Sequence, residues 1–180
     1  MKFQAVLFDF DYTLGDATEA IVTGFQYAFA RMGLAEPDRE SVRTTVGYIL
    51  EDGYTLLTGD GDPGQRALFR RYYVEKANPL QISTTQLFPG ARALLEALRE
   101  RGIPAGVVSS KKGSTLRGVL EHLDVVRLLC SVTGGDQVAR PKPDPEGILA
   151  AVAALNLTPD QVLEHSRLPV WWRCALGHEW

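Results

Sequence analysis

The sequence predicts an α/β fold, in which a Rossmann-like parallel sheet carries an inserted all-helical region. Short apolar runs at residues 3–7 and 103–109 have the length and composition of buried parallel strands. After residue 89, such runs alternate with helical patterns of about 10 to 15 residues, as in right-handed βαβ units. Residues 16–82 show helical patterns only. We therefore expect a sheet core of residues 1–15 and 83–180 and a helical insertion of residues 16–82.

The insertion divides into short amphipathic helices. Apolar side chains recur at helical spacing up to Gly33, which marks the end of the first helix, and a Gly- and Asp-rich loop at residues 59–64 precedes the last. The expected helices cover residues 16–34, 37–46, 48–58 and 65–78.

The second half of the chain alternates between helix and strand. The expected helices are residues 91–101, 113–123 and 145–156, and the expected strands are residues 103–109 and 128–133. Thr158 and Pro159 have the composition of a helix start, and residues 161–163 begin a fourth strand.

Composition excludes several classes of partner. The chain has 180 residues, 45% of them hydrophobic, which is ample for a core. A net charge of −3 argues against nucleic acid or an anionic membrane as the main partner, and no apolar stretch reaches the length of a membrane span. Cys130 and Cys174 form no disulfide framework, and no signal peptide opens the chain. We expect a cytoplasmic protein.

The candidate site begins with two acids at the end of the first strand. Asp9 and Asp11 are two residues apart, so their side chains project toward the same side of the sheet. Two like charges this close disfavour joint ionisation. Chains tolerate this cost when a cation lies between the acids, or when one acid stays protonated for acid–base work.

Polar residues at the other strand ends add to this pair. Ser109 ends the strand of residues 103–109 and Ser110 follows it, and Lys142 lies in a proline-rich loop. Ligands of parallel sheets bind at the carboxyl ends of the strands, so these side chains lie where a substrate would bind. Two acids, hydroxyl groups and an ammonium group together suit phosphoryl transfer. In this interpretation Asp9 attacks phosphorus, Asp11 transfers protons, and Mg²⁺ between carboxylate and phosphate offsets the charge crowding.

The other polar residues near the strand ends are either candidates for phosphate binding or structural residues of loops and turns. Ser109 and Lys142 are expected to bind the phosphate, and Thr13 and Ser110 join them as candidates at the same strand ends. Ser110 and Lys111 also read as ordinary loop residues. Asp136 is interpreted as a turn residue and Asp144 as an acid at a helix N-terminus.

Three motifs in order resemble one known family. Phe-Asp-Phe-Asp-Tyr-Thr-Leu at residues 8–14, Val-Val-Ser-Ser-Lys at 107–111 and Arg-Pro-Lys-Pro-Asp-Pro-Glu at 140–146 are similar to the haloacid dehalogenase (HAD) superfamily. The helical insertion after the first motif resembles its phosphoglycolate-phosphatase-like branch, whose insertion is a cap.

The resemblance carries roles for individual residues. It implies Asp9 as nucleophile and magnesium ligand, and Asp11 as general acid/base that also binds the metal. It implies Ser109 and Lys142 as phosphate ligands, and a small phosphorylated metabolite as substrate. The second acid favours a phosphatase over a dehalogenase.

The chain departs from the family pattern near its end. The family expects a fourth strand that ends in metal-binding aspartates, but no aspartate follows Asp160, and Glu164 and Glu179 are the only later acids. We expect an incomplete sheet, in which the strand carrying Asp9 is an exposed edge that promotes self-association, and the apolar helix at residues 147–154 is uncovered. Weak magnesium binding and slow turnover would follow.

Two alternatives to a working phosphatase stay open. One is a catalytically impaired HAD-fold protein or binding module that lacks the fourth-motif acids. The other is a receiver-like phosphoacceptor domain, which is disfavoured because its acids, acceptor and lysine would lie on separate strands.

Overall fold

The structure is a computed structural model, and it describes residues 4–165. The chain divides into two compact units. One, the sheet unit, contains Met1–Asp16 and Gln86–Trp180, and the other, the helical unit, contains Ala17–Thr85.

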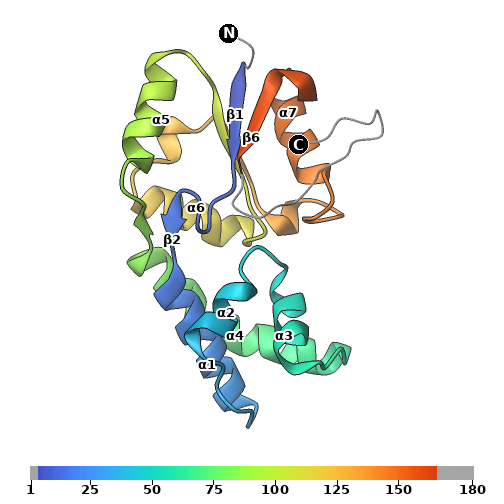
Figure 1. The fold of residues 1–180 in the computed structure, drawn as a ribbon. Helices are drawn as coiled ribbons and strands as arrows, with labels where there is room; N and C mark the ends of the chain where they lie inside the picture. Colours follow the sequence, from blue (N-terminus) through green and yellow to red (C-terminus); the bar gives the residue numbers. More distant parts are fainter. Residues whose placement is uncertain (1–3, 166–180) are drawn as a thin grey trace. The chain divides into compact units, whose positions relative to one another are not determined.

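The sheet unit is built on four parallel strands in the order β5-β4-β1-β6 (Figure 1). They are β1 (Ala5–Phe8), β4 (Ala105–Val108), β5 (Ser131–Thr133) and β6 (Val162–His165). In the register of the sheet, Phe8 at the end of β1 pairs with Val107 of β4 on one side and with His165 of β6 on the other. The α/β fold and the parallel sheet expected from the sequence are therefore confirmed.

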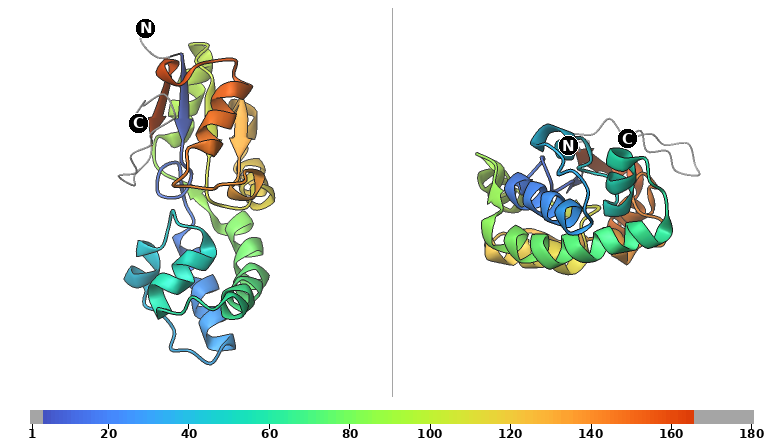
Figure 2. Two further views of the ribbon diagram at one scale, coloured as in Figure 1. Left: turned by 90° about the vertical axis from the view of Figure 1, so that its right-hand side faces the viewer. Right: turned by 90° about the horizontal axis from the view of Figure 1, so that it is seen from below.

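Helices cover both faces of this sheet. They are α5 (Ala91–Glu100), α6 (Gly113–His122) and α7 (Glu146–Ala154). Crossovers between parallel strands are right-handed, and the chain reverses its direction across the sheet after β5. Accordingly, α5 and α6 lie on one face and α7 on the other (Figures 1 and 2).

The strand carrying the paired acids is not the edge that the sequence led us to expect. β1 lies between β4 and β6, and Ala5 pairs with Val162, which is buried. The residues from 161 onward keep enough apolar character for a fourth strand to form. The expectation that β1 is an exposed edge is wrong for this reason. Self-association, which was inferred from that edge, stays a prediction that this structure does not test.

The apolar helix α7 is likewise covered. Ile148, Ala151 and Val152 are buried in one cluster with Leu7 of β1 and Val108 of β4. The expectation that this helix is uncovered is therefore wrong, because its apolar face packs on the centre of the sheet.

The helix expected to begin near Thr158 is only a short turn. A 3-10 helix, η3, covers Pro159–Gln161, and the Gln161 side chain accepts hydrogen bonds from the backbone N–H and the hydroxyl of Thr158. The capping signal is thus real, but β6 begins directly after it.

Short elements complete the sheet unit. They are β2 (Gly15–Asp16), β3 (Gln86–Leu87), η1 (Val126–Leu128) and η2 (Gly135–Gln137). β2 and β3 pair antiparallel, at the two points where the chain enters and leaves the helical unit.

The helical unit consists of four helices around an aromatic core. They are α1 (Thr18–Arg31), α2 (Arg39–Thr44), α3 (Leu50–Thr58) and α4 (Pro63–Thr84). The rings of Phe25, Phe29, Tyr54, Phe69 and Tyr73 contact one another in the core. Within the described part of the chain, no helix has both the length and the apolar character needed to cross a membrane.

The last of these helices is longer than the sequence predicts. α4 continues past Pro79, which removes one backbone hydrogen bond from the helix. In the turn after Pro79, Gln81 is buried, and its amide donates a 2.8 Å hydrogen bond to the hydroxyl of Tyr73, two turns earlier in the same helix.

Candidate active site

A tight turn after β1 positions the paired acids. The carbonyl of Phe10 accepts backbone hydrogen bonds from Thr13, Leu14 and Gly15, at 3.2, 2.9 and 3.0 Å. The Phe10 ring is fully buried, and a Cβ on Gly15 would lie 2.6 Å from it, so only glycine fits there. The two acids are therefore presented by a backbone whose shape is fixed by hydrogen bonds and close packing.

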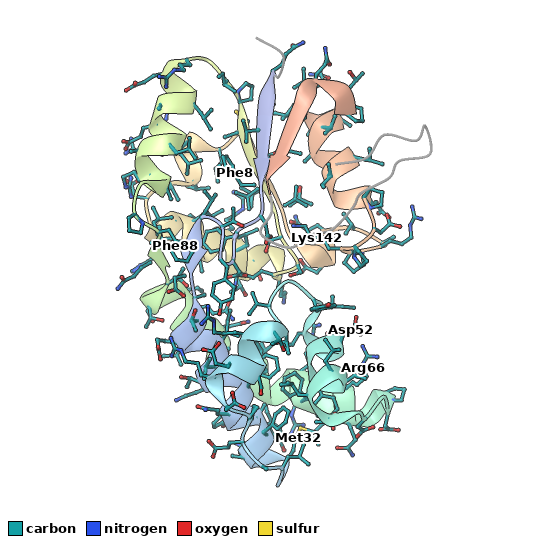
Figure 3. All side chains as sticks on the ribbon, in the orientation of Figure 1. Phe8, Met32, Asp52, Arg66, Phe88 and Lys142 are labelled. Atoms are coloured by element: carbon teal, nitrogen blue, oxygen red, sulfur yellow. The ribbon has the colours of Figure 1, made fainter. Side chains whose placement is uncertain are left out.

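Asp9 forms a buried ion pair with Lys142. The Lys142 ammonium lies 3.1 Å from Oδ1 of Asp9, and their side chains are 10% and 9% exposed. Figure 3 shows Lys142 beyond the end of β1, below the label of Phe8. The structure thus joins two predicted site residues that are 133 positions apart.

Glu146 organises the loop that carries Lys142. Its carboxylate accepts hydrogen bonds from the backbone N–H groups of Ala139 and Arg140, at 2.8 and 3.1 Å, and from the Arg140 side chain at 3.3 Å. These donors, the Ala139 N–H first among them, lower the pKa of Glu146. Arg140 also pairs with Asp144, which itself accepts from the Glu146 N–H at the start of α7, as interpreted from the sequence.

Asp11 forms the second buried ion pair, with Lys111. The ammonium of Lys111 lies 3.3 Å from Oδ2 of Asp11, and the side chains are 7% and 12% exposed. The other oxygen of Asp11, Oδ1, is buried and has no hydrogen-bond partner within the described residues. Burial raises the pKa of Asp11, the Lys111 ammonium opposes this rise, and the neighbouring Asp9 adds to it.

Lys111 is the site residue that sequence reasoning missed. Its interpretation as an ordinary loop residue is wrong, because the ammonium is buried against Asp11. The available signal was its place directly after two strand-end serines, on the strand next to β1.

Ser109 lies at the same edge of the sheet, immediately after β4. Ser109 is buried, its N–H donates to the Thr133 carbonyl at 2.9 Å, and its Oγ accepts from the Lys111 N–H at 3.2 Å. A hydroxyl that accepts this bond keeps its own proton to donate. With Lys142, it lines a pocket of about 240 Å³, open solvent included, whose wall also contains Gly134, Gly135 and Asp144.

The other two candidates for phosphate binding, Thr13 and Ser110, differ in their surroundings. Oγ1 of Thr13 is buried and lacks a hydrogen-bond partner within residues 4–165, which leaves a costly polar group that a ligand oxygen could satisfy. Ser110 is half-buried, and its carbonyl packs closely against Gly135. Over the same residues, no hydrogen bond joins Ser110 to either acid, so its place in the site remains a prediction.

Asp136 holds the start of α6 in place. It lies in η2, after β5, and its Oδ1 accepts a 2.7 Å hydrogen bond from the N–H of Gly113, the first residue of α6. A carboxylate at a helix N-terminus stabilises the exposed N–H groups there. Asp136 thus supports the segment between Ser109 and α6.

The acids present fit a magnesium ion, although they form a small set. In the described part of the chain, no three His, Cys, Asp or Glu side chains cluster as a metal site would. Magnesium in proteins is bound through one or two carboxylates together with water and substrate phosphate, and Asp11 offers a buried oxygen without a hydrogen-bond partner. Of Glu164 the structure describes the backbone alone, and Glu179 lies outside the described residues.

The fold and the site together define a class of protein. It is a doubly wound α/β protein with a helical insertion after the first strand and a pair of acids, each bound to a lysine, at the carboxyl edge of the sheet. A family model described as haloacid dehalogenase-like hydrolase matches residues 6–164. The chain belongs to this family.

Individual relatives agree with this assignment. A phosphoglycolate phosphatase of Rhodospirillum rubrum is 31% identical over 173 residues, which cover 89% of this chain and 70% of the relative. A phosphoglycolate phosphatase of Salmonella typhimurium is 30% identical over 187 residues, which cover 90% of this chain and 73% of the relative. A crystal structure from Bacteroides fragilis, described as a haloacid dehalogenase-like hydrolase, superposes with a TM-score of 0.87 at 34% identity, over 91% of this chain and 78% of that one.

Proposed function

We propose that this protein is a magnesium-dependent phosphatase that hydrolyses a small phosphomonoester through an aspartyl-phosphate intermediate. The observation that carries the proposal is the buried ion pair of Asp9 and Lys142, which places a carboxylate and an ammonium group together at the carboxyl edge of the sheet. The similarity to two phosphoglycolate phosphatases supports a phosphate ester as the substrate.

Two chemical steps follow from these residues. In the first, an oxygen of Asp9 attacks phosphorus, the ester bond breaks, and Asp11 gives its proton to the leaving oxygen. In the second, Asp11 takes a proton from water, the water oxygen attacks the phosphorus of the acyl phosphate, and phosphate leaves as the Asp9 carboxylate is regenerated. A raised pKa suits Asp11 for the first step, because it increases the fraction of the acid form.

The phosphate needs cationic and hydrogen-bonding partners. Lys142 and Ser109 line one pocket, so an ammonium and a hydroxyl can contact phosphoryl oxygens there, and the buried hydroxyl of Thr13 is a further candidate. Asp9 and Asp11 would hold the metal ion, and bound Mg²⁺ supplies a positive charge that stabilises the charge developing on the phosphoryl group.

The helical unit, Ala17–Thr85, is proposed to act as a cap that selects the substrate and excludes water. The substrate we infer is a small phosphorylated metabolite, and the two cysteines without a disulfide framework support a cytoplasmic setting.

The test is hydrolysis of a generic aryl phosphate with and without Mg²⁺. The wild-type chain should be active only with the metal, Asp9→Asn should abolish turnover, and Asp11→Asn should lower kcat by about 10² to 10⁴, the range for loss of a general acid. Asp124→Asn, a change of an exposed acid that pairs with Arg127, is the matched control and should keep wild-type rates.

A second function is favoured by one observation. Among the side chains that the structure describes, no third acid joins Asp9 and Asp11, which fits a binding module or a catalytically impaired relative. Equal inactivity of the wild-type chain and Asp9→Asn at saturating Mg²⁺ would support this second function and overturn the first.

A further inference from the structure

We propose that Lys111 is a positioning residue that holds Asp11 and, by its charge, weakens the binding of a divalent cation at the paired acids. The proposal deepens the proposed function and rests on it in one respect, that Mg²⁺ is the metal of this site.

The backbone of Lys111 is held firmly at the edge of the sheet. Its N–H donates to Oγ of Ser109 at 3.2 Å, and its carbonyl accepts from the N–H of Gly135 at 3.0 Å. A Cβ on Gly134 would lie 2.8 Å from the same carbonyl, so the loop after β5 packs directly on this residue. The side chain therefore extends toward Asp11 from a fixed base.

The ion pair that results is largely removed from water. Only 7% of the Lys111 side chain and 12% of the Asp11 side chain is exposed, and the ammonium lies 3.3 Å from Oδ2. Exposed charges are screened by water and salt, but a buried pair is screened much less. The charge of Lys111 is consequently felt by any ion that approaches the two acids.

The four charged side chains described at the paired acids balance one another. Two carboxylates, Asp9 and Asp11, contact two ammonium groups, Lys142 and Lys111, at 3.1 and 3.3 Å. A divalent cation gains from an excess of negative charge, and this set of four residues has none. A neutral residue in place of Lys111 would leave one excess negative charge beside the metal, whichever oxygens of the acids bind it.

Lys111 and Lys142 differ in what else they can do. Lys142 lines the pocket with Ser109, so its charge is available to a phosphate. Among the ion pairs of the described residues, the one that Asp11 forms with a lysine is with Lys111, while the charge of Lys142 acts on Asp11 from farther away. The residue that holds the proposed general acid, Lys111, is thus also the residue whose charge weakens the binding of the metal ion.

The experiment is a calorimetric Mg²⁺ titration of the full chain without substrate. Lys111→Met should bind Mg²⁺ on the order of tenfold more tightly than wild type, since one repulsive charge near a buried site is removed. Lys111→Arg keeps the charge and should stay near the wild-type affinity. The matched control is Lys112→Met, which removes the same charge from the neighbouring exposed position and should change the affinity by less than about twofold.

Stability gives an independent measurement, and it covers the case in which a variant folds poorly. Without Mg²⁺, Lys111→Met leaves the Asp11 carboxylate buried and unpaired, so its Tm should fall, and saturating Mg²⁺ should raise that Tm by more than it raises the wild-type Tm. Lys111→Gln, which retains a hydrogen-bond donor, should behave in the same way with a smaller loss.

Three results would overturn the inference: unchanged or weaker Mg²⁺ binding by Lys111→Met, an equal gain in Lys112→Met, or no Mg²⁺ binding by any of these chains. Failure of the proposed function is distinguishable, because a chain that binds Mg²⁺ as expected but hydrolyses no phosphate ester refutes the phosphatase and leaves the role of Lys111 intact.

Discussion

Two ion pairs explain how the chain tolerates acids as close as Asp9 and Asp11. Both carboxylates are buried, and each contacts an ammonium group whose opposite charge offsets the crowding of two like charges. The two acids are nevertheless not equivalent. Asp11 keeps one buried oxygen without a described partner and has a raised pKa, which suits the proposed acid. Asp9 pairs with Lys142, which lines a pocket with Ser109, and this suits the proposed nucleophile.

Glu146 should make a pH-dependent contribution to the stability of the Lys142 loop. Its pKa is lowered from 4.5 in the folded chain, so between the lowered and the ordinary value the unfolded chain binds more protons. Stability from Glu146 is therefore fully present above about pH 4.5 and is lost as the pH falls through the lowered pKa. Glu146→Gln should unfold more easily than wild type at neutral pH, and the difference should shrink in acid, as followed by urea denaturation across pH.

The same variant should affect substrate binding. Without the carboxylate that orders residues 139 and 140, Lys142 is held less firmly, and KM for an aryl phosphate should rise several-fold. Glu121→Gln, which changes an exposed position on α6, is the control for a general charge effect. A stability difference that stays constant from neutral to acidic pH would contradict the role given to Glu146.

At the residue scale, the sequence predicts most of the site but not all of it. Asp9 and Lys142 could be named because each lies in a motif whose chemistry needs that residue type. Lys111 was not named, although it follows two strand-end serines, because a lysine after a strand is usually solvated, and the fold shows that its ammonium group pairs with Asp11.

At the scale of elements, packing determines what local patterns leave undecided. The helix signal at Thr158 and Pro159 has an N-cap and a first-turn proline, yet the structure forms one 3-10 turn there before β6. A proline inside a helix disfavours its continuation, yet α4 continues past Pro79, and Gln81 in the following turn is buried. Local signals of this kind are weak relative to tertiary contacts.

Helices α1 and α4 approach closely at Gly24, which gives a prediction for the helical unit. A Cβ at this position would lie 2.6 Å from Cβ of Ala77 and 2.8 Å from the Tyr73 ring, both of which are buried. Gly24→Ala gains about 1 kcal/mol of helix propensity but overpacks the contact at a cost of about 1 to 3 kcal/mol. We expect a net loss of about 1 kcal/mol in the free energy of unfolding, measured by chemical denaturation.

The control for this substitution is Gly61→Ala, where a Cβ would meet no atom within 4 Å. It should leave stability nearly unchanged. A Gly24→Ala chain more stable than wild type would show that the two helices can separate at no cost, contrary to the packing described.

At the scale of the whole molecule, the sheet order determines where chemistry can occur. β1 lies between β4 and β6, so the residues that follow its end meet those that follow β4, and the loop after β5 reaches the same edge. The alternation of strands and helices predicts a parallel sheet with right-handed crossovers, whereas the order of the strands is a finding of the structure. The exposed edge was wrongly predicted because the unusual composition after residue 163 was taken to prevent a strand whose first residues, including Val162, already pair with β1.

The most direct test of the central claim is detection of the phosphoryl group on Asp9. Asp11→Asn should still transfer a phosphoryl group from an aryl phosphate, whose leaving group needs little help from an acid, but should release it slowly. After an acid quench in the presence of Mg²⁺, mass spectrometry should find one added phosphoryl group on the peptide that contains Asp9, and Asp9→Asn should show none. Hydrolysis without any modification of Asp9, or a phosphoryl group on another residue, would contradict the account.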